Sequence, residues 1–380
     1  MGGREGNRVL VTGMGILAAG AASAPELGRI LEGDSPPGPV DITAFEVPPT
    51  GGVPEVAFEL TDFEITDYLE SIKSYIDRTS ALACAAAKLA LDDAGLAAAG
   101  EEGRPEVGLA YGTCWGCLDS MELFFHKVKE GNPRLASPLP FSHSYANSPA
   151  AVLSIEFALR GFHTVSSSGW NSATIAVSQA AEAIRRGASP AVLAGGSESG
   201  SHGRFMHLLG KGMIGEGGGG GAVFGEGGCF LVLESAESAA ARGARPLAEI
   251  IGWGSGSAGQ GAAGDKLCSE CMRASIESAC ADGGVDAASV AAYCGCASGV
   301  GAVDAAEVHG FADFAGRPEG EARALAISPY LATGLVEGVS GAFAAALGVL
   351  VAREERGPDA VGTLDPGGSA AALVIGPVEE

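Results

Sequence analysis

Apolar residues are arranged along the chain in two ways, as short unbroken runs and as longer stretches with helical spacing. Residues 8–14 and 107–111 are short apolar runs, a pattern typical of buried strands. Residues 77–93 carry small and apolar side chains at helical spacing, and Asp77 or Thr79 can cap the start of this predicted helix. The alternation predicts an α/β protein with helices on both faces of its sheets.

A central segment, residues 164–200, reads as strand, tight turn, helix and strand. A β-prone run is followed by three serines and Gly169, after which apolar residues recur with helical spacing as far as Ile184. Such a turn places its residues at the start of a helix, where free N–H groups and the positive dipole end stabilise an anion. The Ser-Gly-Trp at its apex is therefore where we expect a nucleophile, if the chain has one.

The second half of the chain repeats the pattern of the first. Residues 246–254 match residues 8–15 as a strand that runs into a glycine turn. Near the C-terminus, another strand and turn lead into a helical segment, residues 338–352, which mirrors the central unit. We predict two related α/β halves, residues 1–240 and 241–380, that form one compact unit.

Charge and hydropathy restrict the partners and the compartment. The net charge is −23, and a surface this acidic repels nucleic acid and anionic membranes, so neither is an expected partner. No apolar run reaches the length needed to span a bilayer, and glycines interrupt the apolar stretch near the N-terminus, which argues against a secretion signal. We expect a cytoplasmic protein.

The nine cysteines are odd in number and lie mostly in apolar segments, which favours reduced thiols. Two CxxC units, at Cys114 and at Cys268, are far apart in the sequence and lack a supporting histidine. The sequence therefore predicts packed thiols, and neither a metal nor a cofactor.

Several segments, in this order, resemble β-ketoacyl synthases of the thiolase superfamily over nearly the whole chain. They are RVLVTGMG, DRTSALACAAAKLALDDAGL, AIRRGASPAVLAGGSES, FGEGGCFLVLESAESAAARGARPLAEI and the terminal PGGSAAALVI. The resemblance implies a thiolase fold, in which two pseudo-repeated halves form layers in the order α-β-α-β-α.

The resemblance also locates the family's reactive positions. Active members use a cysteine nucleophile at the strand-to-helix elbow, two histidines and a lysine. In this sequence the cysteine position falls on Gly169, the histidines on Cys296 and Leu335, and the lysine on Tyr330. Residues 365–368, Asp-Pro-Gly-Gly, stand where the family has a flexible Gly-Phe-Gly-Gly. A glycine cannot be acylated, so the resemblance implies a subunit without condensing chemistry of its own.

The class that this pattern resembles is the chain-length factor, the ketosynthase-β subunit of type II polyketide synthases. The resemblance implies a heterodimer with an active ketosynthase, in which this chain shapes the tunnel for an aromatic polyketide or a polyene. Acyl carrier proteins are themselves typically acidic, so we expect the carrier protein to dock mainly on the catalytic partner.

Two other functions remain open. An acyltransferase or hydrolase on the same scaffold would use Ser168 or Cys296 as its nucleophile, which requires a base within hydrogen-bond reach. His163 lies close by on the same predicted strand, while the resemblance implies that Asp304 and Glu307 anchor the loop that carries Cys296. Turn-forming serines and a packed thiol are the simpler interpretation. The third function is an acyl-binding homodimer.

Four further residues are predicted to lie at the tunnel or the subunit interface. Trp170 follows the apex of the elbow and is expected to fill the space of an acyl chain or to contact the partner. Cys117, Met121 and Phe125 share one face of a predicted helix that begins near Leu118. By resemblance to chain-length factors, bulky residues on this face would limit the length of the product.

Overall fold

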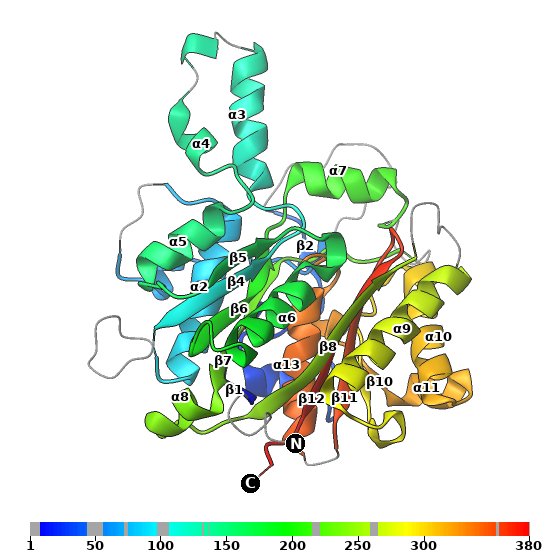
Figure 1. Ribbon diagram of the computed structural model, residues 1–380. Coiled ribbons are helices and arrows are strands. Elements are labelled where there is room, and N and C mark those ends of the chain that lie inside the picture. Colours follow the sequence, from blue (N-terminus) through cyan, green and yellow to red (C-terminus); the bar gives the residue numbers. More distant parts are fainter. Residues whose placement is uncertain are drawn as a thin grey trace.

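The computed structural model describes residues 8–43, 56–71, 75–96, 106–130, 133–135, 137–214, 221–258, 265–354 and 357–379. Ten of the described strands form one continuous sheet in the order β10-β9-β11-β12-β8-β1-β7-β6-β4-β5. Its two groups of five meet where residues 9–11 of β1 pair with β8. Figure 1 shows the strands running through the middle of the molecule, with helices on both sides.

The two groups have the same order of parallel and antiparallel pairs. In the first group, β7 is antiparallel to β1 and β6, and β4 is parallel to β6 and β5. In the second, β12 is antiparallel to β8 and β11, and β9 is parallel to β11 and β10. This confirms the predicted duplication of the fold, while the boundary at residue 240 stays a prediction. The first-group strands are β1 (Val9–Ala18), β4 (Val107–Gly112), β5 (His163–Ser166), β6 (Ala191–Glu198) and β7 (Gly227–Ser235). The second-group strands are β8 (Ala248–Ser257), β9 (Tyr293–Cys294), β10 (Ala326–Ile327), β11 (Asp359–Asp365) and β12 (Ser369–Gly376).

Strand β9 is much shorter than the apolar run at residues 290–296 suggests. Only Tyr293 and Cys294 pair with their neighbours on both sides. The chain then leaves the sheet, because the N–H groups of Cys296 and Ala297 are bound by the Glu307 carboxylate instead of a strand.

Helices complete five layers in the order α-β-α-β-α. Helices α6 (Ser172–Arg185) and α13 (Ser340–Ala352) contact each other between the two groups of strands. Helix α2 (Arg78–Asp93) packs on the first group, and α9 (Asp265–Gly283) and α10 (Gly301–Ala315) pack at the second. The alternation along β6 shows why, since Val192 shares a core cluster with α6 while the next residue, Leu193, shares one with α2. The predicted layering is therefore confirmed.

The start of α2 is fixed as its sequence predicts. Asp77 caps the helix, and its Oδ1 accepts a hydrogen bond from the Thr79 N–H at 2.9 Å. Helix α2 lies so close to β1 that a Cβ on Gly15 would stand 2.0 Å from the Ala86 carbonyl oxygen. The glycines at residues 13 and 15 of β1 thus allow backbone-to-backbone packing of helix on strand.

A helical arm projects from the body beside the first group of strands (Figure 1). It comprises α3 (Leu118–Glu130) and α4 (Pro138–Ser142), which contact each other. Phe124 links them, with its ring centroid 5.0 Å from that of Phe141. The remaining helices of the described residues are α1 (Ala24–Gly28), α5 (Ser148–Glu156), α7 (His202–Gly210), α8 (Ala236–Ala241), α11 (Glu319–Leu325) and α12 (Tyr330–Thr333). A separate two-stranded sheet joins β2 (Val40–Asp41) and β3 (Val56–Ala57).

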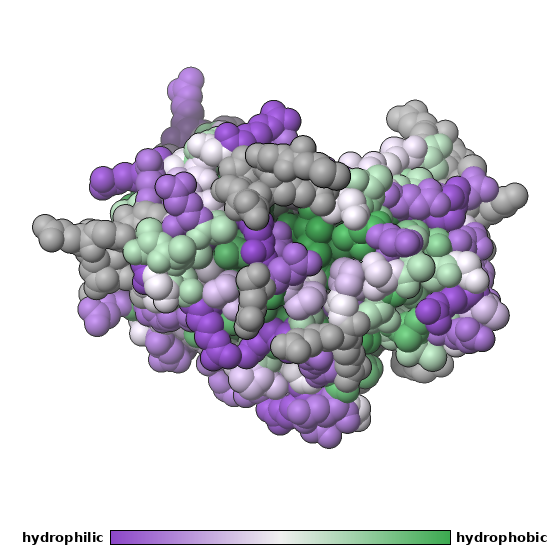
Figure 2. Space-filling view, turned by 60° about the horizontal axis from the view of Figure 1, so that its bottom comes forward, coloured by the Kyte–Doolittle hydropathy of each residue, from purple (hydrophilic) through white to green (hydrophobic). Residues whose placement is uncertain are grey.

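The surface is mixed in polarity. On the face shown in Figure 2, hydrophilic residues are spread around the outline and hydrophobic residues gather towards the middle. Among the described residues, no helix combines the length and the apolar character that crossing a membrane requires.

Candidate functional site

The predicted strand, turn and helix are present at the elbow. Strand β5 ends at Ser166, a 3-10 turn covers Gly169–Asn171, and α6 begins at Ser172. Gly169 has a φ of +62°, in the left-handed region that favours glycine. The Ser172 hydroxyl donates to the Gly169 carbonyl oxygen at 2.6 Å and accepts from the Ser168 N–H at 2.9 Å, which closes the turn.

A carboxylate from the end of β11 lies against this turn. The Trp170 N–H donates to Asp365 Oδ2 at 2.9 Å. A Cβ added to Gly169 would stand 2.2 Å from the same oxygen. Residue 169, the predicted nucleophile position, therefore has neither a reactive side chain nor, with Asp365 in this place, room for one.

Cys296, the position predicted for the family's first histidine, carries a thiol and lies in a tightly anchored loop. The two oxygens of Glu307 accept the N–H groups of Cys296 and Ala297, each at 3.1 Å. Asp304 accepts the Ser298 hydroxyl at 2.7 Å and the next N–H in the chain at 3.0 Å. The predicted anchoring role of Asp304 and Glu307 is thus confirmed.

The Cys296 thiol is poorly suited to attack a thioester. Burial raises its pKa well above the usual value, and the Glu307 and Asp304 carboxylates raise it further. The thiol stays protonated at neutral pH, whereas the thiolate is the nucleophilic form. Its sulfur lies 3.6 Å from the Gly362 carbonyl oxygen, the distance of a weak S–H donor contact.

The structure brings Leu335 and Tyr330, the other two predicted reactive positions, together with Trp170 of the elbow. Leu335, Trp170 and the partly buried Tyr330 belong to one apolar cluster. The Tyr330 hydroxyl accepts the Val223 N–H at 2.7 Å, and burial raises its pKa. Ser328 connects Tyr330 to the Cys296 loop, since it donates to the carbonyl oxygen of Cys296 and accepts the N–H of Tyr330.

The elbow serines have structural contacts. The Ser166 hydroxyl donates to the Gln179 side chain at 2.9 Å. The His163 ring forms a hydrogen bond with the Ser154 hydroxyl at 2.7 Å and lies 2.9 Å from the Gly161 carbonyl oxygen, so both of its ring nitrogens have a hydrogen-bond partner. Ser168 is exposed, and its backbone N–H bonds Ser172 within the turn.

A buried ionic network contacts the apolar cluster of Trp170, Tyr330 and Leu335, and it was not predicted from the sequence. Arg204 and Glu337 are fully buried and form an ion pair. Arg204 also donates to the Leu335 carbonyl oxygen at 2.8 Å, so it holds the second histidine position. Glu198 accepts the Thr113 hydroxyl at 3.0 Å and the N–H of Trp115 at 3.2 Å, and burial raises its pKa to about 7. The sequence signal that could have revealed this network is the presence of charged residues, Glu198 in GGSES and Arg204 in HGR, within otherwise apolar segments.

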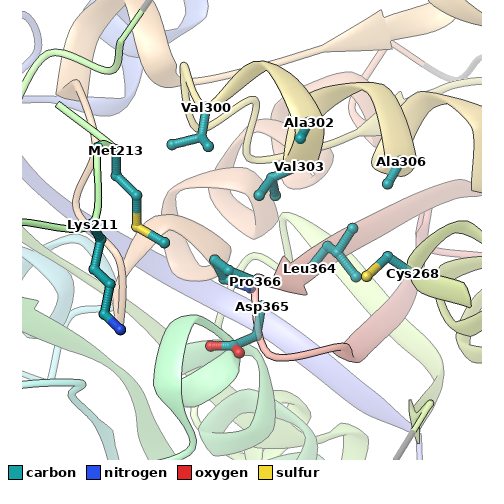
Figure 3. Close-up of a pocket in the computed structure, with 11 residues that line it drawn as sticks. Lys211, Met213, Cys268, Val300, Ala302, Val303, Ala306, Leu364, Asp365 and Pro366 are labelled. Carbon is teal, nitrogen blue, oxygen red and sulfur yellow. The ribbon is translucent and has the colours of Figure 1, made fainter. Parts of the chain in front are cut away.

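Asp365 also lines a cavity of about 260 Å³. Its lining is mostly apolar, and Lys211 and Asp365 are the charged residues in it. Figure 3 shows the Asp365 carboxylate pointing towards the side where Lys211 lies and away from Cys268. The other lining residues are Gly212, Met213, Val300, Ala302, Val303, Ala306, Leu364 and Pro366.

The four predicted tunnel or interface residues lie outside the lining of this cavity. Trp170 is 8% exposed at the elbow, and Cys117 is buried at the base of the arm. Met121 is half-buried, and Phe125, further along α3, is 59% exposed. Their role in a tunnel stays a prediction about the assembled protein.

The sequence and the fold have clear relatives. The family described as "Beta-ketoacyl synthase, N-terminal domain" matches residues 6–239. A 3-oxoacyl-[acyl-carrier-protein] synthase 2 of Vibrio harveyi is 30% identical over 382 residues, covering 94% of this chain and 89% of the relative. The ishigamide ketosynthase/chain length factor has a TM-score of 0.81 at 23% identity, covering 98% of this chain and 100% of the other. A structure of a type II PKS acyl-carrier protein in complex with its ketosynthase bound to the hexaketide has a TM-score of 0.79 at 20% identity, and it also covers 98% of this chain and 100% of the other. The chain belongs to the β-ketoacyl synthase family.

Proposed function

We propose that this protein is a catalytically silent, chain-length-factor-like subunit that pairs with an active ketosynthase and shapes the tunnel for the growing acyl chain. The observation that carries the proposal is Gly169 at the nucleophile position, with the Asp365 carboxylate bound to the adjacent N–H. Acylation requires a side-chain nucleophile at that point, and Gly169 has none.

The other reactive positions support the same function. Leu335 has no donor for a thioester carbonyl, and the Tyr330 hydroxyl is bonded to backbone. Cys296 is the sole thiol among these positions, and its raised pKa keeps it protonated. The competing acyltransferase or hydrolase would need a base that hydrogen-bonds the Ser168 hydroxyl or the Cys296 thiol. The His163 ring instead bonds Ser154 and the Gly161 carbonyl oxygen, and the Cys296 thiol contacts the Gly362 carbonyl oxygen.

The surface near the elbow is suited to a protein partner. Strand β5 ends the sheet and pairs with β4 on one side, so its outer edge offers backbone groups to another strand. Val165 on this strand is 37% exposed. The arm also exposes large apolar side chains, which mark interaction surfaces when they gather. They are Leu123, Phe125, Leu139 and Phe141.

Co-expression with a ketosynthase that has an intact cysteine tests the pairing. We expect a stable one-to-one complex by native mass spectrometry, with the acyl carrier protein cross-linking mainly to the catalytic subunit. A stable homodimer of this chain that never pairs with a ketosynthase would instead support the acyl-binding homodimer.

Mass spectrometry of the intact chain after incubation with acyl thioesters tests the absence of chemistry. We expect no covalent adduct on this chain and an acyl group on the partner. An adduct that disappears in Ser168→Ala or Cys296→Ala would overturn the proposal in favour of the acyltransferase or hydrolase.

Product length tests the predicted tunnel face. In the reconstituted complex, Met121→Trp should shorten the product and Phe125→Ala should lengthen it. Lys127→Ala is the matched control, because Lys127 is also an exposed residue of α3 and is not one of the apolar side chains of the arm. An unchanged product distribution in both variants would remove these residues from the tunnel.

A further inference from the structure

The Asp365 carboxylate stands where the side chain of a nucleophile would stand. Its Oδ2 accepts the Trp170 N–H at 2.9 Å and lies 2.2 Å from the Cβ position of residue 169. Its Oδ1 accepts the Gly367 N–H at 2.7 Å. Both oxygens are therefore held by backbone donors, which fixes the orientation of the carboxylate.

An anion in this place changes what the elbow can accept. The Trp170 N–H belongs to the turn that leads into α6, where N–H groups and the helix dipole favour negative charge. Asp365 already provides that charge through a charge-assisted hydrogen bond. A second anion at this place would be repelled by the carboxylate.

The same side chain forms part of the cavity wall. Asp365 and Pro366 lie at the end of β11, and apolar side chains such as Val300 and Val303 make up most of the remaining wall (Figure 3). The end of the cavity next to the elbow therefore carries the Asp365 carboxylate, and Lys211, on the side towards which this carboxylate points, is the cationic residue of the lining.

We propose that Asp365 is a specificity-determining residue, an internal anion that takes the anion position of the elbow and excludes carboxylates and thioester oxyanions from it. The inference rests on the proposed function only in treating residue 169 as the nucleophile position. It explains why a glycine is required there, because the carboxylate uses the space that a side chain would need.

The first test measures hydrogen exchange of the Trp170 amide by mass spectrometry with residue-level fragmentation. Asp365→Ala should increase the exchange rate at least tenfold, because the amide loses its acceptor. Asp62→Ala, at an exposed acidic residue outside the cavity lining, is the control and should leave the rate unchanged. Equal rates in wild type and Asp365→Ala would overturn the proposal.

The second test introduces a thiol and compares a neutral probe with an anionic one. In Gly169→Cys, we measure the rate of alkylation of residue 169 by iodoacetamide and by iodoacetate, in both of which the thiolate displaces iodide. The ratio of the iodoacetate rate to the iodoacetamide rate should rise at least tenfold when Asp365→Ala or Asp365→Asn is added. A ratio that stays within twofold would overturn the proposal.

The ratio cancels differences in the pKa of the introduced thiol, and the asparagine variant separates charge from bulk. If Gly169→Cys does not fold, the amide exchange test still decides. Both tests are carried out on the full chain, alone or with its ketosynthase. Failure to form a heterodimer would contradict the proposed function and leave these two outcomes unaffected.

Discussion

Removing Arg204 from its buried ion pair should produce a large loss of stability. Both side chains of the pair are fully buried, and the guanidinium also donates to three backbone carbonyl oxygens at 2.8 to 2.9 Å. Arg204→Met leaves the Glu337 carboxylate buried without a counter-ion, which costs about 3–5 kcal/mol of the free energy of unfolding. The carbonyl groups that lose their donor belong to Ser199, Gly225 and Leu335.

The double variant Arg204→Met/Glu337→Leu separates the loss of the pair from the exposure of one charge. It removes the uncompensated carboxylate and leaves the three carbonyl groups and the Trp115 indole N–H without partners, each at about 1 kcal/mol. The double variant should therefore be more stable than the sum of the two single effects predicts, by at least about 2 kcal/mol.

Urea unfolding of the four proteins at pH 7, with linear extrapolation and a check that the m value is unchanged, measures this coupling. Effects that add to within about 0.5 kcal/mol would refute the reasoning, because they would mean that the two side chains act independently. A matched control is Arg273→Met, since Arg273 pairs with Glu277 on the exposed face of α9 and should contribute about 0.5 kcal/mol or less.

Three further predictions concern the cap of α2, the Cys296 loop and its thiol. Asp77→Ala should lower the free energy of unfolding by about 1–2 kcal/mol in urea, through loss of the cap and of the two hydrogen bonds that Asp77 accepts from Ser120, and Asp77→Asn by less; equal effects would contradict the capping role. Burial raises the pKa of Glu307 to about 7 from its usual 4.5, so the native state holds more protons between these values and stability falls as the pH rises from about 4.5 to about 7. The stability of wild type relative to Glu307→Gln should thus fall from pH 5 to pH 8 by up to about 3 kcal/mol, and a pH-independent difference in urea unfolding would contradict the shift. Iodoacetamide at pH 8 should leave Cys296 unlabelled in the native protein and label it fully in urea; rapid native labelling would show an accessible thiolate.

Local patterns predicted the parts of the molecule that depend on neighbours in the sequence. The helix that follows Asp77 and the elbow at Gly169 are set by capping and turn chemistry, which a sequence displays directly. The Glu307 anchor was implied by the resemblance to β-ketoacyl synthases, and its hydrogen bonds are also short in range. Arg204 and Asp365 could not be found in this way. Their partners come from segments far away in the chain, and only the closed layers of the fold bring them into contact.

The elements that shape the site are held by side chains that bind backbone groups. Arg204 holds the Leu335 carbonyl oxygen, and Glu307 holds the Cys296 loop through two backbone N–H groups. These hydrogen bonds end on backbone atoms, so they can form whatever side chain stands at residues 296 and 335. Under the proposed function, a glycine at residue 169 removes the nucleophile without removing the architecture, and the Asp365 carboxylate satisfies the Trp170 N–H at the elbow. The proposed structural role in an assembly therefore requires no change in how the backbone of the site is held.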